Sequence, residues 1–198
     1  PEALVKEQLS FCKEIGIKGR LLISREGVNG TFEGTPEQIE LYKENLIRYD
    51  DFKDLVFKES EGNGEAFPRL QVKMRDEIVA LGVDGLDPKK NTATQLPAEE
   101  LHKWYEENED FVVLDLRNDY EIASGVFKGS VDPDLQNFRE LPEKIKSIEN
   151  LKNKKVVSVC TGGIRCELAT TYLKEKGFTN LYQLENGIHD YMQKFPNK

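Results

Sequence analysis

A cysteine followed by two glycines and an arginine is the segment of the sequence best suited to chemistry. Residues 160–165 read Cys-Thr-Gly-Gly-Ile-Arg and directly follow an apolar run at 156–159. A short β-branched run is typical of a buried strand, and the glycines permit a tight turn in which backbone N–H groups converge. Such a ring of amides at a helix start favours a thiolate and lowers a cysteine pKa from ~8.5 to about 3.5–7.5. We therefore interpret Cys160 as a nucleophile.

The alternative for Cys160 is a small buried hydrophobic group, which is the commoner fate of a free cysteine. The length of the loop separates two chemistries. From Cys160 to Arg165 the loop has six residues, whereas phosphatase loops of similar pattern insert one more and make room for a phosphate. The shorter loop favours sulfur chemistry.

The residues after Cys160 form a predicted anion-binding loop. Its members are Thr161, Gly162, Gly163, Ile164 and Arg165. Arg165 could hold an anionic substrate group and favour the thiolate, or it could pair with a carboxylate and fix the loop. For Cys166 the sequence leaves two roles open, a thiol that resolves an oxidised or persulfidated Cys160 and a small packing group.

The C-terminal half alternates helices and strands. The pattern predicts helices at 97–107, 142–148 and 167–176 and strands at 111–114, 156–159 and 181–184. This alternation indicates a parallel sheet covered by helices on both faces. Ligand sites in such sheets lie at the carboxyl ends of strands, where Cys160 sits.

The N-terminal half reads as a smaller α+β domain. A helical pattern that includes Cys12 precedes a hairpin at 21–33, a helix capped by Thr35, and a strand at 55–58. This order fits a ferredoxin-like domain that lacks its first strand, which would precede Pro1. The predicted boundaries are an N-terminal domain at 1–81, a polar linker at 82–96 and a C-terminal domain at 97–195.

Composition indicates a soluble globular protein with 38% hydrophobic and 32% charged residues. No apolar run is long enough to cross a bilayer, so no membrane partner is expected. The three cysteines argue against a disulfide framework and for a reducing compartment, so we expect a cytoplasmic protein. His102 and His189 have no cysteine or carboxylate at ligand spacing, so no metal site is predicted.

The net charge of −8 is the wrong global sign for a protein that neutralises many phosphates. A local basic surface is still compatible with it. Six cations lie on or beside predicted neighbouring strands of the N-terminal half: Lys18, Arg20, Arg25, Arg69, Lys73 and Arg75. The sequence leaves open whether they form one surface or are scattered solvated charges.

Several segments of the C-terminal half resemble a rhodanese domain in the same order. They are the loop at 160–167, the strand at 111–117 that ends in Asp-x-Arg, the segment at 125–130 and the final strand and helix start at 177–188. The resemblance implies a C-terminal rhodanese-like parallel sheet flanked by helices. We interpret Asp115, Arg117 and Glu121 as residues that hold adjoining loops.

The residue sequence of the loop, together with the segments at 131–134 and 138–140, resembles the sequences of the bacterial rhodanese-containing family of oxygen-dependent tRNA wobble-uridine hydroxylases. The N-terminal segments at 21–31 and 67–73 are similar to that family's leading domain. The resemblance implies 5-hydroxylation of the wobble uridine, molecular oxygen as co-substrate, and the tRNA anticodon loop as partner. It also implies that Arg139 is a second cationic contact for substrate. No motif for an oxygen-activating cofactor is found.

Two other classes of function stay open at this point. The first is a sulfurtransferase in which Cys160 takes sulfur from thiosulfate or a protein donor. The second is a non-catalytic binding module with a rhodanese fold, which the intact loop disfavours. The sequence does not indicate an oligomeric state.

Overall fold

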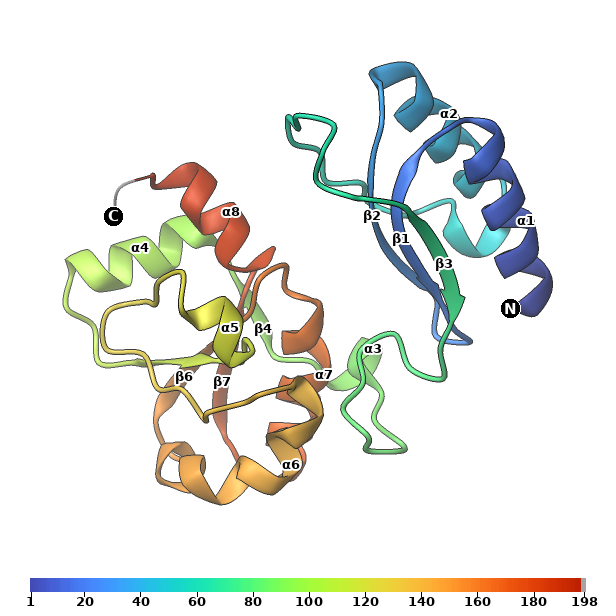
Figure 1. Cartoon of the computed structure of the whole chain (residues 1–198). Helices are drawn as coiled ribbons and strands as arrows, with labels where there is room; N and C mark the ends of the chain where they lie inside the picture. Colours follow the sequence, from blue (N-terminus) through green and yellow to red (C-terminus); the bar gives the residue numbers. More distant parts are fainter. Residues whose placement is uncertain (197–198) are drawn as a thin grey trace. The chain divides into compact units, whose positions relative to one another are not determined.

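The computed structural model describes residues 1–196, and the chain divides into two compact units (Figure 1). The first unit is Pro1–Ile78 and the second begins at Val79. Each unit has its own hydrophobic core. No helix within the described residues is long and apolar enough to cross a membrane.

The N-terminal unit is an α+β domain, as predicted. Its elements are α1 (Glu2–Glu14), β1 (Lys18–Ile23), β2 (Val28–Glu33), α2 (Pro36–Ile47), the 3₁₀ turn η1 (Asp50–Phe52) and β3 (Leu70–Met74). The sheet order is β2-β1-β3, with β1 antiparallel to β2 and parallel to β3. Figure 1 shows α1 and α2 on the same side of these strands.

Local sequence signals explain the two helices. Thr35 accepts a hydrogen bond from the backbone N–H of Gln38, whose side chain returns a bond to the Thr35 backbone, so α2 begins with a complete capping box. Cys12 of α1 is fully buried in the core, as the helical pattern predicted. The predicted strand at 55–58 is wrong. Leu55 and Phe57 pack against the core from an irregular segment, and the next strand is β3.

The C-terminal unit contains a four-stranded parallel sheet in the order β4-β7-β6-β5. Its elements are α3 (Pro88–Asn91), β4 (Thr94–Leu96), α4 (Ala98–Glu106), β5 (Val112–Asp115), α5 (Asp119–Ile122), η2 (Phe138–Glu140), α6 (Leu141–Lys144), η3 (Ile145–Leu151), β6 (Lys155–Val159), α7 (Ile164–Glu175), β7 (Asn180–Leu184) and α8 (Gly187–Lys194). The predicted parallel sheet with flanking helices is confirmed.

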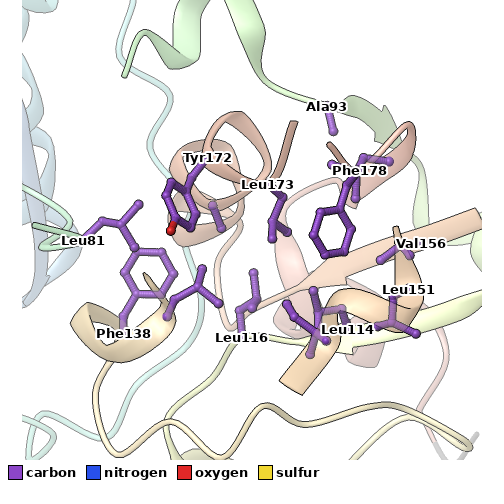
Figure 2. Close-up of a cluster of buried hydrophobic side chains, with 14 of the residues drawn as sticks. Leu81, Ala93, Leu114, Leu116, Phe138, Leu151, Val156, Tyr172, Leu173 and Phe178 are labelled. Carbon is purple, nitrogen blue, oxygen red and sulfur yellow. The ribbon is translucent and has the colours of Figure 1, made fainter. Parts of the chain in front are cut away.

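The segment 82–96, predicted as a linker, is part of the C-terminal unit. It contains α3 and β4, and β4 is an edge strand of the sheet. Ala93 of this segment and Leu81, which lies inside the predicted first domain, are both buried in the core of the second unit (Figure 2). The polar residues between them concealed the apolar positions that anchor the segment.

Alternate side chains of the strands enter cores on opposite faces of this sheet. Leu114 and Val156 belong to a cluster with α7 and α6, whereas Val113 and Val157 belong to a cluster with α4 and α8. Each fully buried side chain of this size stabilises the fold by roughly 1.5–3 kcal/mol relative to exposure. The two cores fix β6, and β6 carries Cys160 directly after its carboxyl end.

Candidate functional site

Cys160 lies where β6 gives way to a turn that leads into α7. Cys160 shares the side-chain parity of Val156 and Ser158 on β6, so its thiol faces the α7 side of the sheet. Gly163 caps α7 with a φ of 93°, a left-handed conformation that glycine adopts without strain. The backbone N–H of Gly163 donates a hydrogen bond to the Cys160 sulfur at 3.2 Å. The loop therefore aims an amide at the sulfur, as its sequence predicted.

The start of α8 holds the loop from a second side. The N–H groups of Ile188 and His189 donate to the carbonyl oxygens of Cys160 and Thr161 at 2.9 and 3.1 Å. Gly187 makes this approach feasible, because a Cβ on Gly187 would lie 2.5 Å from both of these oxygens. Two elements far apart in sequence thus fix the backbone of the loop.

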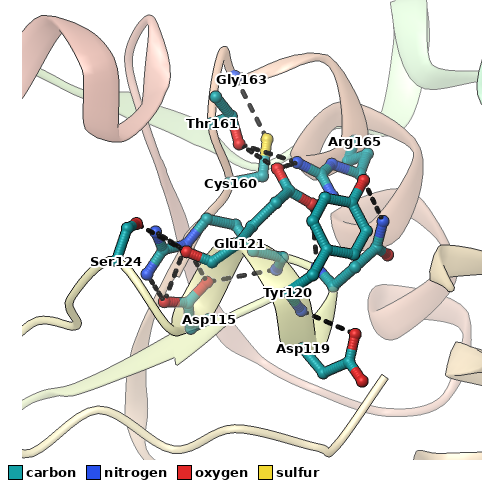
Figure 3. A network of polar contacts seen from close by, with 11 residues as sticks. Asp115, Asp119, Tyr120, Glu121, Ser124, Cys160, Thr161, Gly163 and Arg165 are labelled. Atoms are coloured by element: carbon teal, nitrogen blue, oxygen red, sulfur yellow. Dashed lines mark hydrogen bonds and ion pairs between the residues drawn. The ribbon is translucent and has the colours of Figure 1, made fainter. Parts of the chain in front are cut away.

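Arg165 and Glu121 close the loop with an ion pair (Figure 3). The guanidinium donates to both carboxylate oxygens at 2.6 Å, and it also donates to the Thr161 hydroxyl at 2.9 Å. The Thr161 hydroxyl in turn donates to Glu121. Burial alone would raise the pKa of Glu121, but these hydrogen bonds outweigh it and lower the pKa to about 2. The same contacts raise the pKa of Arg165, so both groups are charged.

A buried ion pair fixes the segment that carries Glu121. Arg117 and Asp115 are 5% and 0% exposed, and their side chains form hydrogen bonds of 2.7–3.2 Å. The remaining N–H groups of Arg117 donate to the carbonyls of Glu121 and Gly125 at 3.2 and 2.6 Å. The predicted role of these residues in holding adjoining loops agrees with these contacts. Glu121, by contrast, also contacts the reactive loop directly.

Cys160 and Cys166 form an asymmetric pair of thiols. A hydrogen bond from the Cys166 thiol lowers the pKa of Cys160 to about 6, with support from the Arg165 charge and from the N–H groups of Cys166 and Gly163, although burial opposes this change. Burial, together with the neighbouring Cys160, raises the pKa of Cys166 well above its usual range. The two shifts run in opposite directions, so Cys160 is the more acidic thiol and Cys166 is the hydrogen-bond donor of the pair.

Replacing Cys166 by alanine is expected to raise the pKa of Cys160, because a hydrogen bond to a charged group contributes about 1.5–3 kcal/mol and each pKa unit corresponds to about 1.4 kcal/mol. We expect the midpoint of Cys160 alkylation by iodoacetamide against pH to rise by about one to two pH units. Cys166→Ser retains a donor and should shift the midpoint less. Cys12→Ala removes a buried thiol from the other unit and should leave it unchanged. Equal midpoints in all variants would reject this role for Cys166.

The structure brings most of the predicted site residues together. Thr161, Gly163, Arg165 and Cys166 all contact Cys160 or one another, and Ile164 begins α7 with 42% of its surface exposed. Arg139 lies elsewhere, with its side chain 3.6 Å from the place of a Cβ on Gly82. Its role as a substrate contact stays a prediction.

The structure settles two features that the sequence left open. Cys160 is 1% exposed, so the sulfur is covered rather than open at the strand tip. Glu121 closes the loop on Arg165, and the sequence signal for it was the capping box that joins Glu121 to Asn118 just after the Asp-x-Arg strand end. Among the described residues, no group of three or more His, Cys, Asp or Glu side chains could hold a metal ion.

The arrangement is suited to nucleophilic or sulfur-transfer chemistry. A thiolate is the reactive form of cysteine, and this one is stabilised by a thiol donor, backbone amides and a guanidinium. The same donors can stabilise negative charge that develops next to the sulfur during a reaction.

Comparisons with known proteins cover both units. Residues 1–78 match the UPF0176 acylphosphatase like domain, and residues 97–194 match the Rhodanese-like domain. A protein of Legionella pneumophila (strain Paris) named tRNA uridine(34) hydroxylase is 43% identical over 98% of this chain and 77% of its own length. A protein of Bacillus licheniformis with the same name is 44% identical over 96% of this chain and 60% of its own length. A crystal structure of a rhodanese-like domain protein from Staphylococcus aureus aligns with 50% of this chain and 90% of its own, at 26% identity and a TM-score of 0.43.

Proposed function

The chain belongs to the tRNA uridine(34) hydroxylase family, and we propose that it catalyses oxygen-dependent 5-hydroxylation of the wobble uridine in tRNA through Cys160. The observation that carries the proposal is the intact loop, which holds the Cys160 sulfur against the Gly163 amide and is closed by Arg165 and Glu121, within a chain that matches these relatives over both units. A fold alone would not support an activity, since rhodanese-like folds host several functions. The relatives' shared name favours hydroxylation over sulfur transfer.

The substrate must reach a sulfur that is covered in this structure. Glu121 of α5 contacts Arg165 and Thr161 of the loop through side-chain hydrogen bonds. These contacts can break without a change in the backbone. Their release would free the guanidinium for an anionic group of the substrate. In this proposal, Glu121 occupies the place of that group while the substrate is absent.

The oxidant in this proposal is molecular oxygen, and the partner is the anticodon loop of tRNA. The chain would supply binding, orientation and the thiolate. Cys160 could act as the free thiolate or as its persulfide, in which case a sulfur donor would be a second partner.

The test is mass spectrometry of tRNA from cells that lack the gene. Complementation with the full-length protein should restore 5-hydroxylation of the wobble uridine, and Cys160→Ser should not. Cys12→Ser is the matched control, because Cys12 is buried in the core of the other unit. Wobble-uridine hydroxylation that survives deletion of the gene, in the absence of any other hydroxylase, would reject the proposed function.

A second measurement separates hydroxylation from sulfur transfer. Incubation with thiosulfate should add the mass of one sulfur atom to the native protein, but not to Cys160→Ser, if the thiolate carries sulfur. A protein that accepts sulfur and leaves tRNA unchanged would be a sulfurtransferase.

A further inference from the structure

One face of the N-terminal sheet is free of helices within its own unit. Both α1 and α2 pack on the same side of the strands (Figure 1). Leu21 and Ile23 of β1 are buried and share the side-chain parity of Ile17, which packs with residues of both helices, so they face the helices. Neighbouring residues of a strand point to opposite faces of the sheet. The intervening positions of β1, which include Lys18 and Arg20, therefore lie on the open face, and both are exposed.

Strand register places cations of β3 on that same open face. Arg20 pairs with Gln71, and Leu22 pairs with Lys73. The N–H of Arg75 donates to the carbonyl of Ile23 at 2.9 Å, so the hydrogen bonding between β1 and β3 continues for one residue beyond β3. Because side chains alternate between the faces, Arg75 lies on the same face as Lys73. We call Lys18, Arg20, Lys73 and Arg75 the basic face, and all four are exposed.

The rest of the open face carries little negative charge. The residues of β2 that pair with Lys18, Arg20 and Leu22 are Glu33, Thr31 and Asn29. The Glu33 carboxylate accepts hydrogen bonds from the backbone N–H groups of Ala66 and Phe67 at 2.9 and 3.1 Å. The single acid of these paired positions is therefore engaged by backbone amides.

Charge is segregated between the two sides of this unit. Helices α1 and α2 together carry six glutamates and three lysines. Within the described residues of this unit, Lys43 of α2 forms ion pairs with Glu40 and Glu59, and no member of the basic face takes part in an ion pair. Although the chain has a net charge of −8, the open face of this sheet thus carries four cations that form no ion pair within the described residues.

We propose that the basic face binds the sugar-phosphate backbone of the RNA substrate. The inference rests on the proposed function, which supplies an RNA as partner, and it adds the surface that holds it. Lysine and arginine bind phosphates by displacing counterions, and exposed cations without carboxylate partners do so without first breaking an ion pair. Such contacts position the RNA and do not read its sequence.

The experiment measures binding of an unmodified tRNA transcript to the full chain by fluorescence anisotropy at several salt concentrations. The test variant is Arg20→Gln with Lys73→Gln, since both side chains are exposed and their loss should not unfold the sheet. Loss of two phosphate contacts should make the slope of log K against log salt shallower by about 1.4–1.8. At ~0.15 M salt this corresponds to about 10- to 30-fold weaker binding.

The matched control is Lys6→Gln with Lys13→Gln, which removes the same charge from exposed positions of α1. It should leave the salt slope unchanged. Equal slopes and affinities for the two double variants would overturn the basic face while leaving the proposed hydroxylation intact. If no hydroxylation occurs but tRNA binding depends on Arg20 and Lys73, the proposed function fails and the basic face stands. The proposal would also be overturned if Arg20→Gln with Lys73→Gln weakened binding to anionic lipid vesicles but left binding to tRNA unchanged.

Discussion

Arg117→Met is expected to lower the free energy of unfolding of the C-terminal unit by about 3–5 kcal/mol, because it leaves a buried carboxylate without its partner. Asp115 is 0% exposed, and its oxygens accept three hydrogen bonds from the Arg117 guanidinium. The substitution also removes the donors to the carbonyls of Glu121 and Gly125. Urea denaturation followed by tryptophan fluorescence measures this loss, since Trp104 is the single tryptophan and lies in this unit.

Two further variants separate a buried charge from a general loss of packing. The double variant Asp115→Leu with Arg117→Met removes both charges and should recover part of the stability, because apolar replacements of a buried pair are often tolerated. Lys152→Met breaks a more exposed pair with Glu149 and should cost less than about 1 kcal/mol. A cost for Arg117→Met as small as that of Lys152→Met would contradict the expectation.

The reactive loop could be predicted from the sequence because its signals are local. The β-branched run before Cys160, the glycines after it and the helix that follows all lie within a short segment, and each has a direct physical meaning. The parallel sheet was predictable for the same reason, since alternation of helices and strands is visible along the chain. The structure contains the predicted parallel sheet, and in the loop a backbone amide donates to the Cys160 sulfur.

Contacts between distant segments could not be predicted in this way. Glu121 and Arg165 are 44 positions apart, and nothing in the sequence near either residue specifies the other as its partner. The burial of Leu81 and the pairing of β4 depend on packing against α7 and β7, so the polar composition of 82–96 was misleading. The basic face likewise required the register between β1 and β3.

The same long-range contacts link stability to reactivity. Arg117 holds the backbone at Glu121, Glu121 orients Arg165, and Arg165 stabilises the Cys160 thiolate. A residue that never touches the sulfur can thus influence it through two intermediates. Arg165 is the member of this series of contacts that interacts directly with Cys160. Its removal should therefore affect the chemistry more than the removal of Arg117.

Arg165→Met is expected to raise the pKa of Cys160 above about 6 and to slow tRNA hydroxylation by ~10²–10³-fold. The positive charge of the guanidinium favours the Cys160 thiolate, and the guanidinium fixes the loop through Glu121 and Thr161, so both the ionisation of Cys160 and the loop geometry depend on it. Arg165→Lys keeps the charge but cannot form the bidentate pair with Glu121. Its Cys160 pKa and its hydroxylation rate should therefore lie between those of the native protein and those of Arg165→Met. The measurements are the pH midpoint of iodoacetamide alkylation at Cys160 and the initial rate of hydroxylation.

Lys146→Met, at an exposed position of η3, is the matched loss of one cation and should change neither quantity. A thermal unfolding scan distinguishes a local change in the loop from destabilisation of the whole domain, because only the latter would lower the melting temperature by several degrees. If Arg165→Met alkylates with the midpoint of the native protein and hydroxylates at its rate, the guanidinium does not control the thiolate. The acidity of Cys160 would then have to come from Cys166 and the backbone amides alone.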